Sequence, residues 1–183
     1  TMPLVVVPGR AGLQLDLAIR YDSTAGEGFL GMGFSIAGLS SITRCPKTIA
    51  QDGEIQPIID KLSDALCLDD KRLIQVNPAS PKPIEFRTFP DTFSKVVASY
   101  AEAEGWAIHH GAKSFEVFTK DGLILTYGGE DTSRVIAKNG AVRSWLLSRV
   151  RDRSENTIDF QYVNTKHPTE GYTVEHAPSR IEY

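Results

Sequence analysis

A glycine-rich stretch, Gly26-Glu27-Gly28-Phe29-Leu30-Gly31, has the spacing of the loop that binds the pyrophosphate of a dinucleotide. Such a loop functions where a strand precedes it and a helix follows, because the helix N-terminus then meets the phosphates. Here a strand pattern precedes the motif, but residues 32–38 contain two further glycines, and no ribose-binding acid or βαβ unit appears downstream. The motif therefore predicts a tightly turned loop between strands, and no cofactor is expected.

Two histidines and a run of arginines are the other residues whose types could do chemistry. His109 and His110 are adjacent in a predicted strand, where neighbouring side chains face opposite sides, so without a bulge they cannot share a metal ion. Arginines beside an aromatic residue can bind phosphate or stack on bases. Such a face is formed by the alternate positions Arg143, Trp145, Leu147, Arg149, Arg151 and Arg153. Acidic residues between positions 152 and 159 favour an ion-paired strand face instead. The sequence thus identifies no catalytic, cofactor-binding or metal-ligating residue, and we do not expect an enzyme.

The two cysteines, Cys45 and Cys67, are separated by 22 positions and do not form a Cys-x-x-Cys pair, which argues against a structural zinc site. They could form one disulfide in an oxidising compartment. Two buried thiols are the favoured interpretation, because free cysteine is among the most buried residue types. The pairing is left open.

The charge balance excludes several classes of partner. The chain has 183 residues, with 20 Lys+Arg against 23 Asp+Glu and a net charge of −3, so it lacks the basic surplus that coats nucleic acid or anionic membranes. No apolar run approaches the ~20 residues that a membrane-spanning helix needs, and the first residues do not form a signal peptide. We expect one domain over residues 1–183, and the strand-like pattern at 180–183 suggests a segment excised from a larger chain.

Alternation with a period of two dominates the sequence and predicts an all-β fold of antiparallel hairpins. In residues 13–21 the odd positions, from Leu13 to Tyr21, are apolar, which predicts one strand with one buried face. Hairpin turns are predicted at residues 69–71, 120–122, 139–140 and 153–156, and one more strand pair is expected between 95–100 and 106–110. At most one short helix is expected, over residues 58–66, and the four prolines of residues 77–90 predict an extended connector.

Two ordered stretches resemble the SpvB-type N-terminal domain of Tc toxin B components and Rhs-type polymorphic toxins. The first covers residues 8–23, 31–36 and 39–44, and it is similar to the opening of that domain. The second is similar to its later part, where it passes into Tyr-Asp (YD) repeats at 141–163, and it comprises Lys120-Asp121-Gly122, Tyr127-Gly128, residues 145–153, Asn156, Ile158 and Tyr162. Phe34 stands where the family usually has Trp, and Ser154-Glu155-Asn156 replaces the Gly-Asn turn of a YD repeat.

The resemblance implies a structural role. In Tc and Rhs toxins such strands form part of a shell that encloses a toxic C-terminal polypeptide. The implied partners are the rest of the chain's own toxin and this cargo, with other toxin-complex subunits as a further option. Neither nucleic acid nor a membrane span is implied, and the implied location is secreted.

Relatives named SpvB also carry a separate C-terminal domain that ADP-ribosylates actin through an Arg, a Ser-Thr-Ser strand and a Glu-x-Glu turn. Arg20, Ser23-Thr24-Ala25 and Glu102-Ala103-Glu104 match these elements only in part, and the first two lie inside the shell-domain signature. This match is interpreted as chance.

Two functions are therefore weighed. The leading one is a non-catalytic structural module of a secreted toxin's shell. The alternative is a β-rich recognition module that binds a glycan or protein partner through aromatic loops around Phe89, Phe93, Tyr100 and Trp106. The competing interpretation of these rings is that they fill a β core, so the exposure of Phe93 and Trp106 discriminates between the two.

Overall fold

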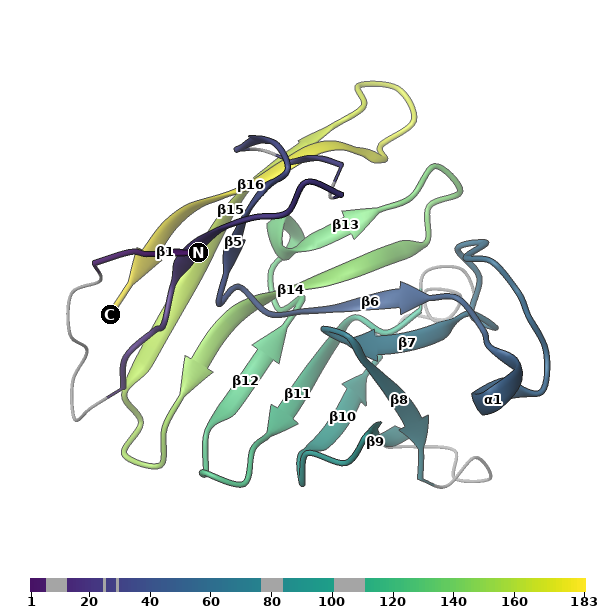
Figure 1. The fold of residues 1–183 in the computed structure, drawn as a ribbon, viewed down its shortest axis with the longest axis horizontal. Coiled ribbons are helices and arrows are strands. Elements are labelled where there is room, and N and C mark those ends of the chain that lie inside the picture. Colours follow the sequence, from purple (N-terminus) through teal and green to yellow (C-terminus); the bar gives the residue numbers. More distant parts are fainter. Residues whose placement is uncertain (6–12, 25, 29, 77–83, 101–110) are drawn as a thin grey trace.

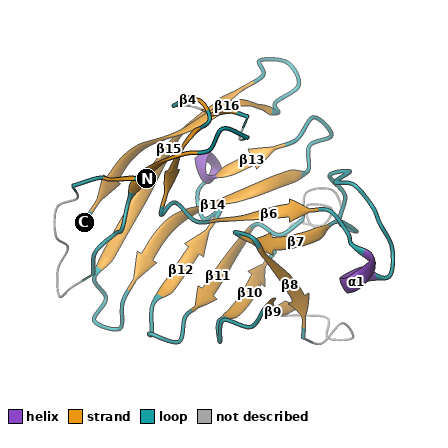
Figure 2. Cartoon of the chain, viewed as in Figure 1, coloured by secondary structure: helices purple, strands orange, loops and turns teal. Residues whose placement is uncertain are grey.

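The computed structural model describes all residues except 6–12, 25, 29, 77–83 and 101–110. Strands dominate the described residues, which confirms the all-β prediction (Figures 1 and 2). The helical elements among them are α1 (Ile49–Asp52) and the 3-10 turn η2 (Asp131–Ser133). Neither of these short elements has the length and apolar character that a membrane-crossing helix requires.

The main architectural feature is an antiparallel sheet whose strands close on themselves. Its strands are β6 (Ser41–Cys45), β7 (Ala65–Leu68), β8 (Lys71–Gln75), β9 (Ile84–Phe89), β10 (Lys95–Ser99), β11 (Ser114–Phe118), β12 (Ile124–Tyr127), β13 (Arg134–Ile136), β14 (Val142–Arg151), β15 (Thr157–Lys166) and β16 (Thr173–Glu182). Neighbours pair in the order β12-β11-β10-β9-β8-β7-β6-β14-β15-β16, and β12 also pairs with β14. The strands from β6 to β12 together with β14 therefore form a closed structure, which we call the ring (Figure 1).

β14 is the strand that closes the ring and carries the sheet onward. Trp145 pairs with Ile42 of β6 on one edge and with Arg134 of β13 on the other. Further along β14, Arg149 pairs with Thr126 of β12 and with Asp159 of β15. β14 thus bonds to four strands, and closure leaves the ring without a free edge along this strand.

The core lies inside the ring and continues under β15. Its fully buried side chains come from strands far apart in sequence: Ile42, Val96, Phe115, Val117, Tyr127, Val142, Trp145 and Ile158. Tyr127 and Trp145 are polar at one end, and each satisfies that end with a hydrogen bond while its ring stays in the core.

A second, smaller unit stands apart from the ring. It consists of β1 (Met2–Pro3), β2 (Ala18–Tyr21) and β5 (Phe34–Ala37), with a hairpin of β3 (Glu27–Gly28) and β4 (Gly31–Met32). We call this unit, together with residues 13–17 that lead into β2, the N-terminal sheet. Leu13 lines a small cavity together with Ile158 and Tyr183. The buried side of the N-terminal sheet therefore faces the β15–β16 end of the main sheet.

The predicted alternation over residues 13–21 is confirmed in part. Leu13, Leu15, Leu17 and Ile19 are more buried than Gln14, Asp16 and Arg20. Tyr21 breaks the pattern because it pairs with Phe34 at the far end of β2, beyond the core, where 59% of its surface is exposed. The regular strand is also shorter than expected, since it covers only Ala18–Tyr21.

The predicted hairpins are present. β11 and β12 pair across the turn at Asp121-Gly122, with Val117 opposite Leu125. β13 and β14 pair across Asn139-Gly140, β7 and β8 across Asp69-Asp70, and β14 and β15 across residues 152–156. Gly122 and Gly140 have positive φ values of 87° and 82°, which explains why glycine ends both turns.

Residues 106–110 lie outside the described residues, so the structure does not describe the expected partner of residues 95–100. The strand over Lys95–Ser99 pairs instead with β9 on one side and β11 on the other.

Two predictions about local structure are wrong. Residues 58–66 are not helical, because the Asp64 carboxylate accepts the backbone N–H groups of Ile59 and Lys61 and holds the chain in a turn. Residues 77–90 are not wholly a connector, because β9 occupies Ile84–Phe89. Pro90 follows this strand and so removes no hydrogen bond from its interior.

The favoured interpretation of the cysteines is also wrong. Cys45 and Cys67 form a disulfide, and no free thiol remains. β6 and β7 are antiparallel neighbours in which Thr43 faces Cys67 and Cys45 faces Ala65, so the two cysteines are diagonal. Their Cα atoms are 5.9 Å apart, within the range that a disulfide spans. Strand register, which spacing along the chain does not reveal, brings them together.

Candidate functional site

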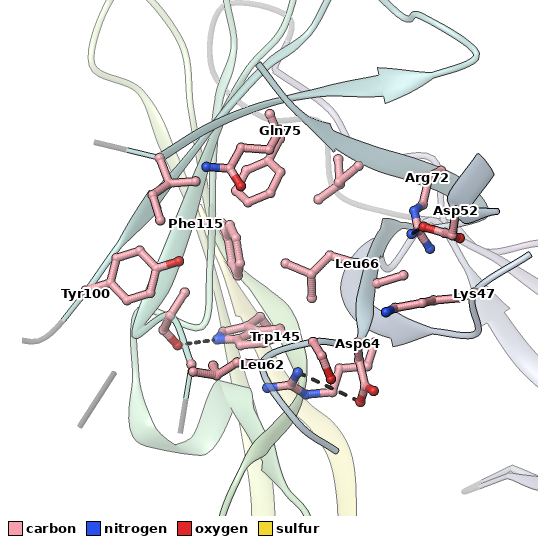
Figure 3. A pocket seen from close by; sticks show the side chains of 18 residues that line it. Lys47, Asp52, Leu62, Asp64, Leu66, Arg72, Gln75, Tyr100, Phe115 and Trp145 are labelled. Atoms are coloured by element: carbon pink, nitrogen blue, oxygen red, sulfur yellow. Dashed lines mark hydrogen bonds and ion pairs between the residues drawn. The ribbon is translucent and has the colours of Figure 1, made fainter. Parts of the chain in front are cut away.

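A cavity of about 580 Å³ opens into the ring between the layer of β6–β8 and the layer of β9–β11. Figure 3 shows side chains from both layers, and from β14, pointing into this space. The charged or polar lining residues are Arg44, Lys47, Asp52, Ser63, Asp64, Arg72, Gln75 and Tyr100. The remaining walls are apolar.

Aromatic residues form the floor of the cavity. Phe115 packs edge-on against Trp145 with ring centroids 5.0 Å apart, and Phe86 lies 6.3 Å from Phe115. The Trp145 indole Nε1 donates a hydrogen bond of 2.9 Å to the Ala112 carbonyl (Figure 3). Since its polar atom is satisfied and its ring is packed on two sides, this floor is rigid.

A buried ion pair stands at one side of the floor. Arg44 and Asp64 are both buried, with their nearest charged atoms 3.9 Å apart. Arg44 also donates from Nε to the Val142 carbonyl at 2.7 Å, and its guanidinium carbon lies 5.8 Å from the centre of the Trp145 ring. Burial lowers the pKa of Arg44, and the Asp64 carboxylate opposes that effect. These contacts fix Arg44 as a structural cation.

A second buried cation, Arg72, differs from Arg44 in that one donor is unused. One terminal nitrogen pairs with Asp52, and the other lies 3.4 Å from the Pro46 carbonyl and 3.7 Å from the Cys45 sulfur. Its Nε is buried and finds no hydrogen-bond partner among the described residues. The neighbouring Lys47 lines the cavity (Figure 3). Its ammonium group pairs with the Glu54 carboxylate at 2.8 Å. Buried donors are nearly always paired, so the Arg72 Nε is an exception that calls for an acceptor.

The arginine face predicted on one strand does not form. Two irregularities in β14 pairing, one at Arg143 and one at Ser148, each insert a residue and reverse which side the following side chains face. Trp145 and Leu147 are therefore buried, whereas Arg143 and Arg149 are exposed.

The ion pairing expected of these arginines is present. Arg143 pairs with Asp60, Arg149 with Asp159 and Arg151 with Glu155. In each of the first two pairs, the hydrogen bond that the arginine donates to the carboxylate is the main cause that raises the pKa of the arginine. The exposed side of this strand is thus a set of surface ion pairs.

The glycine motif lies on the β3–β4 hairpin, with a strand on each side and no helix after it. This arrangement agrees with the predicted turned loop. His109, His110 and Trp106 lie outside the described residues. Among the residues that the structure does describe, no three histidine, cysteine or acidic side chains gather as metal ligands.

The aromatic residues of the alternative recognition function differ in their exposure to solvent. Tyr100 lines the cavity and is half-buried. Phe89 and Phe93 flank the turn between β9 and β10 and are 58% and 75% exposed. Phe93 has a φ of 59°, in the left-handed region that aromatic residues rarely adopt.

A polar network closes the ring on the side of β12. The Ser40 hydroxyl donates to the Asp69 carboxylate at 2.9 Å, so the Tyr127 hydroxyl, 2.9 Å away, donates to Ser40. Burial raises the pKa of Tyr127, which keeps the phenol protonated as this network requires. The network links β6, β7 and β12, and its role is structural.

The sequence interpretation missed the charged residues of the cavity. The burial of Arg44 could have been predicted from the sequence. Arg44 lies two residues after Ile42 in β6, so both side chains are on the same, buried face of the strand. No comparable signal marks Arg72 or Asp52, since their pairing depends on how α1 packs beside β8.

Known proteins share this sequence pattern and this fold. A family model described as SpvB, Salmonella virulence plasmid 65kDa B protein, matches residues 1–179. No curated protein matches the chain.

Several solved structures share the fold. The crystal structure of TcdB2-TccC3 matches with a TM-score of 0.75 at 15% identity, over 98% of this chain and 9% of that one. The N-terminal domain of the effector protein SpvB from Salmonella typhimurium strain LT2 matches with a TM-score of 0.70 at 16% identity, over 100% of this chain and 64% of that one. A Photorhabdus luminescens Tc holotoxin pore matches with a TM-score of 0.70 at 15% identity, over 90% and 8%. The chain thus spans less than two thirds of each of these structures.

Proposed function

This chain belongs to the SpvB family, and from that premise we propose that it is a non-catalytic structural module of a secreted bacterial toxin. In this proposal it forms part of the shell that encloses a toxic C-terminal polypeptide. Its partners are the rest of its own toxin chain and the enclosed cargo, with other toxin-complex subunits as a further option.

The observation that carries the proposal is the extent of the shared fold. Nearly the whole chain superposes on a small part of TcdB2-TccC3, and the same residues superpose on the N-terminal domain of SpvB. A unit that recurs inside much larger toxin chains has the character of a building block. The closed ring and the long β14–β15–β16 ladder supply the continuous sheet that a wall needs.

The charged residues support a structural role as well. Arg44 pairs with Asp64, Arg72 with Asp52, and Arg134 with Asp131, and each guanidinium is more than nine-tenths buried. A catalytic acid or base must instead be free to exchange a proton with a substrate. These groups hold strands and loops together.

The proposed location outside the producing cell is supported by the disulfide. Cys45–Cys67 joins β6 to β7. Disulfides persist in oxidising compartments and are rare in the reducing cytosol.

The proposal is tested in the full-length protein by limited proteolysis. We compare the protein with a variant that lacks residues 1–183 and follow cleavage of the region C-terminal to residue 183. The expected result is faster cleavage in the variant, because an opened shell exposes its cargo. Equal protection in both would contradict enclosure. Residues 1–183 alone are assayed for NAD-dependent transfer, and turnover there would contradict the non-catalytic role.

A second candidate function is recognition of a glycan or protein through the turn between β9 and β10. The exposure of Phe89 and Phe93 favours it, because exposed aromatic rings are frequent binding anchors. The double substitution of both residues by Ser should then abolish binding to a glycan array or to host-cell surface proteins. Unchanged binding would leave these rings without a recognition role.

A further inference from the structure

The disulfide and Arg72 share one face of strands β6 to β8. Cys67 pairs with Arg72 across the β7–β8 hairpin, and Cys45 is diagonal to Cys67 on β6, so the three side chains lie on the same side of the sheet. The alternate positions Ile42 and Leu73 belong to the buried core on the opposite side. Both cysteines are partly exposed. A small thiol dissolved in water can therefore approach the S–S bond.

Arg72 contacts the sulfur atom of Cys45. Its Nη1 lies 3.7 Å from the Cys45 Sγ and 3.4 Å from the Pro46 carbonyl, and its Nη2 pairs with Asp52. The pairing with Asp52 leaves the Nη1 donor in place, so Arg72 acts on Cys45 through a directed hydrogen bond. Such a bond strengthens when its acceptor is ionised, and it therefore favours Cys45 as a thiolate.

The same guanidinium holds the loop of residues 46–64, which joins β6 to β7. Asp52 of α1 lies beside Arg72 and pairs with it (Figure 3). Asp52 also accepts the backbone N–H of Thr48 at 2.9 Å, so it fixes the turn of α1. If Cys45 becomes a thiolate, two anions contact one guanidinium, and the hold of Arg72 on Asp52 weakens.

From these contacts we propose that Cys45–Cys67 is a thiol-exchange site, a latch that keeps the loop of residues 46–64 closed until a small thiol reduces it. The thiolate of the small thiol attacks the Cys67 Sγ and forms a mixed disulfide there. The S–S bond breaks, and its electron pair leaves on Cys45 as a thiolate that accepts the Arg72 hydrogen bond. A good leaving thiolate speeds this exchange.

A second thiol completes the reduction of the latch. Its thiolate attacks the small-molecule sulfur of the mixed disulfide, which releases the oxidised dimer of the small thiol and frees Cys67. Two thiols thus lose two electrons and two protons, and the protein disulfide gains the two electrons. One proton goes to Cys67 and the other to water, because Cys45 stays ionised. The latch does not depend on the shell role, since it concerns the reactivity of one disulfide.

The order of attack is tested in the full-length protein with reduced glutathione as the probe. The reaction is stopped after short times with iodoacetamide, and the peptides that contain Cys45 and Cys67 are analysed by mass spectrometry. We expect glutathione on Cys67 with the alkyl group on Cys45 at least threefold more often than the reverse. An equal or reversed ratio would contradict the role of Arg72.

Variants assign this preference to the Arg72 hydrogen bond. Arg72→Gln should bring the ratio close to one. Arg87→Gln is the matched control, because Arg87 is exposed on β9, and it should keep the parent ratio. An unchanged ratio in folded Arg72→Gln would contradict the assignment. Near-ultraviolet circular dichroism checks folding, and if Arg72→Gln fails to fold, the ratio in the parent decides alone.

Opening of the latch is measured by amide hydrogen exchange of the full-length protein before and after reduction. Labelling times are kept short enough that β10 and β11 stay protected in both states. Peptides from residues 46–64 should exchange at least tenfold faster after reduction. The double variant Cys45→Ser/Cys67→Ser is the control, and its gain should be smaller, because a neutral serine leaves Arg72 to Asp52.

Two exchange results would overturn the latch. One is unchanged exchange of residues 46–64 in the reduced parent, which would mean that noncovalent contacts alone hold the loop. The other is an equal gain in the double variant, which would mean that the Cys45 thiolate does not compete with Asp52 for Arg72.

Discussion

The ring and the N-terminal sheet bury their apolar residues in opposite ways. In the ring, large side chains such as Phe115 and Trp145 are at most 1% exposed, and the strands leave no edge open along β14. In the N-terminal sheet, Met32 is 76% exposed, and the rings of Tyr21 and Phe34 pack at a tilt on the surface with centroids 5.0 Å apart. Closure allows the ring to surround its own core, whereas short open strands bury one face at most.

The ring and the N-terminal sheet should also differ in how much they contribute to the free energy of unfolding. Burial of an aromatic side chain contributes several kcal/mol only where neighbours exclude water from it on all sides. The ring should therefore supply most of the free energy of unfolding, and the N-terminal sheet should contribute through Leu13 and Leu17 alone. Four tests separate these contributions, from the largest expected effect to the smallest.

Trp145→Ala should lower the free energy of unfolding by about 3–5 kcal/mol, the range for deleting a buried aromatic side chain. Trp145 contacts Phe115 and Arg44, and its indole donates to Ala112, so the substitution also leaves a carbonyl without its donor. Phe34→Ala is the matched aromatic control on the N-terminal sheet and should cost less than about 1 kcal/mol. Urea unfolding measures both. Equal losses would remove the distinction between the two regions.

Removing the disulfide should cost about 3 kcal/mol, because Cys45–Cys67 closes a loop of 22 residues within the ring. The double variant Cys45→Ser/Cys67→Ser should therefore unfold at lower urea than the parent. Added reductant should shift the parent toward the variant and leave the variant unchanged. If reductant had no effect on the parent, the cysteines would contribute no covalent constraint.

Leu17→Ala should cost about 2–3 kcal/mol, near the low end for a buried leucine. Leu17 is 8% exposed and lies on the buried side of the N-terminal sheet, where its Cδ2 atom approaches Gly38 closely. Tyr21→Ser, four residues later on the exposed end, is the control and should cost less than about 1 kcal/mol. A loss below about 1 kcal/mol for Leu17→Ala would show that neither side of this sheet is packed.

The Asp60–Arg143 pair should give the smallest effect and a defined pH dependence. The hydrogen bond from Arg143 is the main cause that lowers the pKa of Asp60, against burial, which raises it. Since the folded-state pKa lies below the unfolded value of about 3.9, the pair stabilises the fold above that value, and the stabilisation is lost as pH falls through the folded pKa.

Arg143 is more than half exposed, so solvent limits the contribution of this pair to about 1 kcal/mol or less. The free energy of unfolding of Asp60→Asn should therefore fall below that of the parent at pH 7, and the two should converge as pH falls through the folded-state pKa of Asp60. Asp121→Asn, in an exposed turn, is the control. A difference that stays constant as pH falls from 7 into the acid limb of the unfolding curve would mean that ionisation of Asp60 does not stabilise the fold.

Sequence patterns predicted the local parts of the fold well. The turns at Asp121-Gly122 and Asn139-Gly140 were predictable because tight hairpins need glycine at positive φ, and both are present. The family resemblance was predictable too, because its motifs occur in order over most of the chain, and the family model confirms it.

The failures come from structure that depends on pairing between distant strands. The sequence could not predict which side chains of β14 share a face. Two irregularities in its pairing with β12 and β13 reverse the alternation, and they depend on those partner strands. The disulfide depends on the register of β6 with β7, and the absent helix depends on Asp64 capping N–H groups of its own segment. The cavity charges were missed because Arg72 meets Asp52 only after α1 folds beside β8.

The central claim is that an intact ring forms part of a wall around a passenger polypeptide. It is tested most directly by the rate at which a protease cleaves the region C-terminal to residue 183 in the full-length protein, compared among the parent, Trp145→Ala and Tyr21→Ser. If the ring is part of the wall, cleavage should accelerate several-fold in Trp145→Ala, whose ring is weakened, and stay at the parent rate in Tyr21→Ser. Equal cleavage rates in all three proteins, with the ring shown to be destabilised in Trp145→Ala, would contradict the claim.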